Sequence, residues 1–87
     1  MVRVLEHDIE GYRTWTAANP DGYILNIRGG SKPAMLHRTP CGHVFPAREE
    51  YGDFTRKRKV CAIDRAEIEA WARQNGIGIV LCQNCDV

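Results

Sequence analysis

The spacing of hydrophobic positions in residues 7–22 predicts a helix near the start of the chain. Ile9, Tyr12 and Thr16 recur at helical spacing, and Asp8 stands where a side chain can cap the helix N-terminus. Pro20 cannot continue a helix, and it belongs to an Asn-Pro-Asp-Gly sequence typical of turns. We therefore expect a helix that begins after Asp8 and ends before Pro20.

A second amphipathic segment, IDRAEIEAWARQNG at 63–76, has a clearer helical pattern. Asp64 stands at the capping position, and Glu67, three residues later, completes a capping box. Ile63 can staple to Ile68, and Gly76 suits the left-handed conformation that ends many helices. The stripe expected to be buried consists of Ile68, Trp71 and Ala72.

Four shorter segments have the two-residue alternation or the apolar content of strands: 22–30, 33–38, 57–62 and 77–82. The last two flank the second helix, and a helix of this length allows them to lie parallel. Parallel pairing would bring Cys61 and Cys82, at the ends of these strands, to one end of the sheet. Antiparallel strands would instead leave Cys61 as a small buried hydrophobic residue. The pattern predicts an α+β fold with two helices on a three- to four-stranded mixed sheet.

The length of the chain indicates that this fold needs additional support. With 87 residues we expect one domain over 1–87, whose core is marginal without a disulfide or metal. The first residues, MVRVLEHDIEGYRTW, contain no apolar run long enough for a signal peptide or a membrane span, so we expect a soluble, cytoplasmic protein without membrane association. In a reducing compartment, four cysteines are more typical of metal binding than of disulfides.

The spacing of these cysteines predicts a zinc site. Cys82 and Cys85 form a Cys-x-x-Cys knuckle, and Cys41 in a Pro-Cys-Gly turn supplies a third thiolate. Cys61 is the preferred fourth ligand, with His37 and His43 as alternatives, so the predicted set is Cys41, Cys61, Cys82 and Cys85. Redox catalysis by the knuckle is disfavoured because no helix N-terminus follows it to lower a thiol pKa. A site closed by three or four cysteines is typical of structural zinc.

A run of four cations, Arg56, Lys57, Arg58 and Lys59, is the densest charge feature. Such a run can neutralise phosphates of DNA or RNA, whereas the net charge of +1 gives no attraction over the whole molecule. The alternative is that these side chains solvate the sheet and protect an edge strand.

The string NPDGYILN, MLHRTPCGH, KVCA, EIEAWARQ and LCQNC resembles a small Cys/His-containing bacterial domain, common in actinobacteria, of undefined role and sometimes found beside nuclease or restriction-type modules. The resemblance covers residues 15–85, and its motif residues are His37, Cys41, Cys61, Cys82 and Cys85. This chain departs from the pattern in the EEYGDFTRKR loop. The resemblance implies no particular activity.

Together these features predict a small zinc-binding module that is not an enzyme and that binds nucleic acid through Arg56–Lys59, with Arg38 as a further contact. A protein-interaction adaptor is the alternative, either with an exposed apolar patch for a partner protein or as a homodimer. A metal-dependent nuclease using His37 or His43 is a third possibility. The sequence leaves the oligomeric state open.

Overall fold

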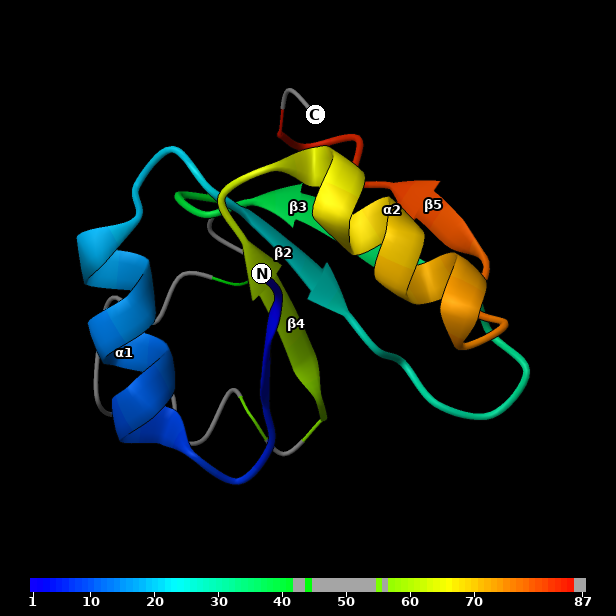
Figure 1. Cartoon of the computed structure of the whole chain (residues 1–87), viewed down its shortest axis with the longest axis horizontal. Coiled ribbons are helices and arrows are strands. Elements are labelled where there is room, and N and C mark those ends of the chain that lie inside the picture. Colours follow the sequence, from blue (N-terminus) through cyan, green and yellow to red (C-terminus); the bar gives the residue numbers. More distant parts are fainter. Residues whose placement is uncertain (42–43, 45–54, 56, 86–87) are drawn as a thin grey trace.

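A computed structural model describes residues 1–41, 44, 55 and 57–85 of the chain. Two helices and five strands follow one another along these residues (Figure 1). They are β1 (Arg3–Leu5), α1 (Ile9–Ala18), β2 (Tyr23–Asn26), β3 (Ala34–Arg38), β4 (Lys59–Ala62), α2 (Arg65–Gln74) and β5 (Ile79–Leu81). The α+β class is confirmed, although the sheet has five strands rather than three or four. Neither helix in the described part of the chain is long and apolar enough to cross a membrane.

The strands form one mixed sheet in the order β1-β4-β2-β3-β5. β1 pairs antiparallel with β4, which the sequence pattern did not predict. β2 pairs antiparallel with both β3 and β4, and β5 lies parallel to β3 at the far edge. β4 and β5 therefore run in the same direction, as expected, but β2 and β3 lie between them.

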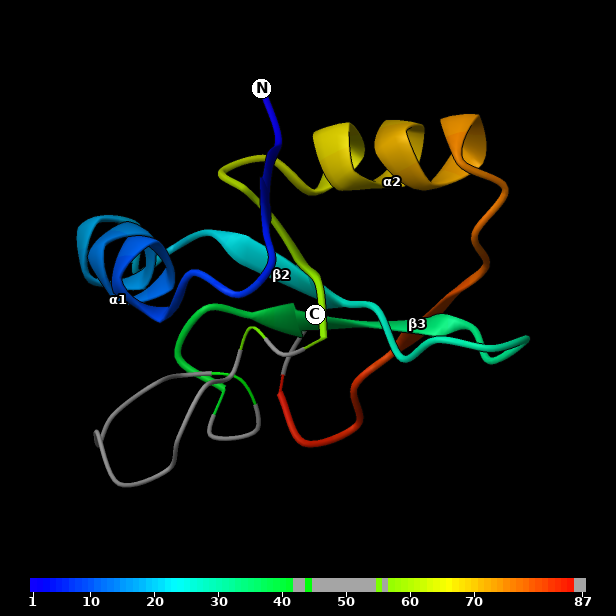
Figure 2. The same cartoon turned by 90° about the horizontal axis from the view of Figure 1, so that it is seen from below.

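Each face of the sheet carries its own group of buried side chains. On one face α2 packs through Ile68 and Ala72, both buried as predicted, while Trp71 is only partly buried. Figure 2 shows α2 on one side of the sheet and the segment after β5 on the other. The second face carries the core group that includes Tyr12 of α1 together with Cys41, Cys61 and Cys82. Three of the four cysteines therefore belong to a single core group.

The helix ends follow the predicted signals with two exceptions. The Asp8 side chain accepts a hydrogen bond of 2.9 Å from the Gly11 N–H and caps α1. Asp64 occupies the capping position of α2, but its side chain makes no capping bond. Ile63 is 64 % exposed, so it does not form the expected staple with Ile68.

The end of α2 has the hydrogen-bond pattern of a Schellman motif. The Ile77 N–H donates to Ala72 O over 2.9 Å, and the Gly76 N–H donates to Arg73 O over 3.3 Å. Gly76 has φ 64°, a conformation that costs side-chain-bearing residues free energy. This turn directs the chain from α2 back toward the sheet, where β5 joins the edge of β3.

Candidate metal centre

Four side chains with metal-binding atoms meet at one end of the sheet. The donor atoms of His37, Cys41, Cys82 and Cys85 all lie within 4.8 Å of one another. His37 belongs to β3, Cys41 to the turn after it, and the two other cysteines to the segment after β5. Segments more than 40 positions apart in sequence thus contribute to one group. This cluster could hold a metal ion.

Parallel pairing of β3 and β5 creates this meeting point. The carboxyl ends of parallel neighbours lie at the same end of a sheet. Leu36 pairs with Leu81, and the next N–H along, that of Cys82, donates to Leu36 O over 2.9 Å. The backbone therefore places Cys82 beside the end of β3, one residue from His37.

The turn that carries Cys41 is held by hydrogen bonds on both sides. The Cys41 N–H donates to Arg38 O, and the Val44 N–H donates to Cys41 O, each over 3.0 Å. The Tyr12 hydroxyl of α1, itself buried, donates to Val44 O. Helical spacing identified Tyr12 as part of the first helix, but no sequence signal indicated that it supports the turn of a metal ligand.

The distances fit a tetrahedral ion. Zinc–sulfur bonds of about 2.3 Å place two thiolates about 3.8 Å apart in a tetrahedron. Cys41 Sγ and Cys82 Sγ are 3.9 Å apart, far beyond the bond of about 2.0 Å that joins sulfurs in a disulfide. Cys41, Cys82 and His37 are 7 %, 3 % and 2 % exposed, whereas Cys85 is partly exposed. The ion would therefore be largely shielded from water.

The knuckle also contains interactions that bear on thiolate formation. The Asn84 N–H points at Cys82 Sγ over 3.4 Å, and a donor in this position favours the thiolate. The pKa of the Cys85 thiol is raised to about 11, mainly by burial; the thiols of Cys41 and Cys82 add to this rise, and hydrogen bonding to the Arg38 backbone opposes it. A divalent cation beside the Cys85 sulfur would favour its thiolate and oppose this rise in pKa.

Cys61, the preferred fourth ligand from sequence, is not in this group. It is fully buried on β4, where it pairs with Ile24 of β2. Ile24 pairs in turn with His37 of β3, so its side chain stands between Cys61 and His37. Strands are about 4.8 Å apart, which puts these two residues about 10 Å apart. The structure thus brings together Cys41, Cys82 and Cys85 with the alternative ligand His37.

The environment of Cys61 is that of a packed core residue. Burial raises the pKa of its thiol to about 12, and the cations of Lys59 and Arg3 oppose that rise. Burial is also the main reason that the pKa of Tyr12 is raised, with smaller contributions from Cys61 and Cys41. His43, the other alternative ligand, lies outside the described residues.

The predicted basic run does not form a uniform surface. Lys57 and Arg58 are exposed, whereas Lys59 is 5 % exposed and its ammonium donates to Asn26 Oδ1 over 2.8 Å. Lys59 is therefore turned into the molecule. Arg56 lies outside the described residues. Arg38 is partly buried, with its guanidinium 5.6 Å from the centre of the Tyr23 ring.

Two of these cations lie beside the β2–β3 hairpin, which adds further basic side chains. The Ile27 N–H donates to Arg58 O over 3.0 Å, and Lys57 Nζ lies beside Gly29. The hairpin carries Arg28, which is partly exposed, and Lys32, which is exposed. We call the four residues Arg28, Lys32, Lys57 and Arg58 the cationic end. The metal cluster lies at the other end of β3, because the hairpin precedes this strand and the cysteine turn follows it.

Comparison with known proteins adds no family assignment. No protein-family model, curated protein or solved structure matches this sequence. The resemblance to a small bacterial Cys/His domain therefore stays a prediction.

Proposed function

We propose that this chain is a small zinc-stabilised module without catalytic activity that binds the phosphate backbone of nucleic acid. The observation that carries the proposal is the cluster of His37, Cys41, Cys82 and Cys85, whose donor atoms lie within 4.8 Å of one another. The cationic end at the opposite end of β3 supports the choice of ligand.

The chemistry of the donors favours zinc. Three thiols and one imidazole match the Cys₃His set of structural zinc sites. Calcium and magnesium prefer oxygen ligands, and the cluster offers none. Four protein donors complete a tetrahedron, so no position remains for the water that a hydrolytic zinc site activates. The proposed zinc is accordingly structural.

The position of the cluster explains why such a small fold would use a metal. The ion would join the end of β3, the turn after it and the segment after β5. β5 has only three residues and pairs with β3 alone among the described strands. Because the free energy of metal binding is also free energy of folding, zinc would hold this edge strand in place.

The cationic end has the composition of a surface that contacts phosphates. Residues 26–34 and 57–62 contain no acidic side chain to offset its charges. They contain no aromatic side chain either, so base stacking of the kind used by single-strand binders is not provided there. Sequence-independent contact with a duplex backbone fits this surface best.

Fluorescence anisotropy with a labelled 20-base-pair DNA duplex tests the proposed binding. Neutralising four phosphates gives a slope of log K against log salt of about −3.6, at about −0.9 per phosphate. The double variant Lys57→Gln/Arg58→Gln should make this slope shallower by about 1.8. Arg13→Gln/Arg65→Gln, which removes the same charge from the two helices, is the matched control and should change it little.

Two results would contradict binding of the duplex through the cationic end. A wild-type protein that shows no affinity for the duplex at 25 mM salt, or that loses as much affinity in the control as in the Lys57/Arg58 variant, does not use the cationic end. Incubation of the same duplex with Mg²⁺ or Mn²⁺ tests the nuclease alternative, and we expect no cleavage.

A further inference from the structure

β5 forms one edge of the sheet, and its outer side has no neighbour among the described strands. On its inner side, Gly78 O accepts from the Ala34 N–H and the Cys82 N–H donates to Leu36 O. Alternate residues of a strand direct their backbone groups to opposite sides, so those of Ile79 and Leu81 point outward. Such a row of N–H and C=O groups is a template for another strand.

This edge lacks the usual protection against pairing. Natural edge strands carry charges or prolines that prevent association. Residues 77–85 contain neither, although 26 % of the chain is charged. The opposite edge strand, β1, contains Arg3 and is followed by Glu6. The two edges therefore differ in charge, and only the β5 edge suits an uncharged partner.

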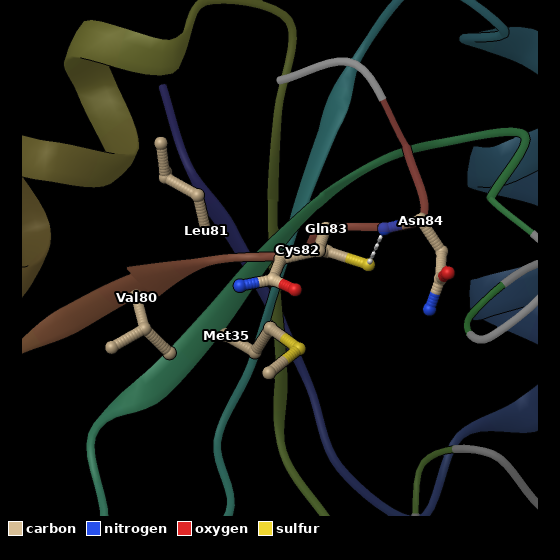
Figure 3. A pocket seen from close by; sticks show the side chains of 6 residues that line it. All are labelled: Met35, Val80, Leu81, Cys82, Gln83 and Asn84. Atoms are coloured by element: carbon tan, nitrogen blue, oxygen red, sulfur yellow. Dashed lines mark hydrogen bonds between the residues drawn. The ribbon is translucent and has the colours of Figure 1, made fainter.

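A cavity of about 390 Å³ adjoins this edge. Met35 and Val80 line it together with Leu81, and the knuckle residues 82–84 complete the wall (Figure 3). Val80 and Leu81 point in opposite directions from β5, so side chains from both faces of this strand contribute to the lining (Figure 3). Both are exposed, at 36 % and 45 %. The volume lies within the range of about 300–1,000 Å³ that is typical of ligand pockets.

We propose that β5 binds an uncharged, extended peptide segment of a partner protein, which adds a sixth strand to the sheet and places an apolar side chain in the cavity. The backbone groups of Ile79 and Leu81 would supply the hydrogen bonds, and the cavity would select the side chain. This binding is separate from the proposed contact with nucleic acid, since it uses none of the residues of the cationic end. It gives the protein-adaptor alternative a defined surface.

The size of the edge favours a peptide over a second copy of this chain. Stable interfaces between folded proteins bury about 1,200–2,000 Å². A three-residue strand with two exposed apolar side chains offers far less than that to another folded molecule. An extended peptide can follow the strand and also enter the cavity beside it.

Selection from a displayed library of random nine-residue peptides against the purified full chain tests the proposal. We expect enriched sequences that alternate apolar and polar residues and lack charge at the central positions. In nuclear magnetic resonance spectra, a selected peptide should shift the amide signals of Ile79 and Leu81 and slow their exchange with solvent. Val80→Lys should weaken its binding at least tenfold.

Val4→Lys is the matched control, because Val4 is an exposed valine on the opposite edge strand, at 43 % exposure. It should leave peptide affinity within twofold of wild type. No enrichment, peptide signals that map away from β5, or equal losses in the two valine variants would overturn the proposal. A wild-type dimer in sizing chromatography that Val80→Lys converts to monomer would assign the edge to a second copy instead. Zinc content measured on every variant separates these outcomes from loss of the metal site.

Discussion

Two cysteine-to-alanine substitutions distinguish a metal cluster from ordinary core packing. Cys61→Ala and Cys85→Ala each remove one sulfur atom. Cys61 is fully buried and lies outside the cluster, whereas Cys85 is partly exposed and belongs to it. Burial alone predicts that the Cys61 substitution costs more stability. Zinc binding by the cluster predicts the reverse.

The two substitutions should differ widely in the stability that they remove. Removing a buried sulfur and leaving a small cavity costs about 1–2 kcal/mol, so Cys61→Ala should lower Tm by about 4–15 °C. A structural zinc site contributes about 10–16 kcal/mol of binding free energy. Domains of this size are stable by about 4–13 kcal/mol in total, so a variant that no longer holds the ion loses most of its stability. Cys85→Ala should therefore lack a cooperative thermal transition.

The assay combines metal content by mass spectrometry with thermal unfolding by circular dichroism. We expect about one zinc per chain in wild type and in Cys61→Ala, and much less than one in Cys85→Ala. Loss of the metal in Cys61→Ala but not in Cys85→Ala would show that the cluster is not the metal site. The same conclusion would follow if both variants keep the metal and Cys61→Ala is the less stable of the two.

Three further predictions concern Tyr12, Gly76 and Cys61. Tyr12→Phe removes the hydroxyl that donates to Val44 O, and it should lower the free energy of unfolding in urea by about 1–2 kcal/mol and weaken zinc affinity in competition against a chelator. An unchanged free energy of unfolding and an unchanged zinc affinity would show that Tyr12 does not support the Cys41 turn. Gly76→Ala, at φ 64° with open space around it, should cost about 1 kcal/mol from backbone strain alone, and an increase in Tm would contradict the left-handed helix end. Because the pKa of Cys61 rises from 9.0 to about 12 in the folded chain, its protonated thiol favours the fold below pH 9, and that contribution is lost as pH rises toward 12. Urea midpoints from pH 8 to 11 should therefore fall more steeply for wild type than for Cys61→Ala, and parallel curves would refute the raised pKa of Cys61.

Local features of this fold could be predicted from sequence because they depend on neighbouring residues. Asp8 caps α1, and Gly76 ends α2 with positive φ, each as its own sequence context indicates. The hairpin glycines Gly29 and Gly30 likewise have positive φ, at 78° and 59°. The three residues of β1 could not be predicted, since that strand is defined by its pairing with β4 rather than by its own pattern.

Spacing along the sequence could not decide which residue completes the metal cluster. Cys61 and His37 each lie near the carboxyl end of a strand, and β3 and β4 run in the same direction. Either residue could approach the knuckle, and only the strand order decides which one does. β5 pairs with β3 and not with β4, so His37 lies beside Cys82. Strand order depends on contacts distant in sequence, which a single sequence does not reveal.

X-ray absorption at the zinc edge of the purified full chain identifies the atoms bound to the ion. We expect three sulfur neighbours at about 2.3 Å and one imidazole nitrogen at about 2.0 Å, with the same spectrum in Cys61→Ala. Four sulfur neighbours in wild type, or a spectrum that changes when Cys61 is replaced, would contradict the assignment of His37. A purified chain that takes up no zinc would contradict the metal centre itself.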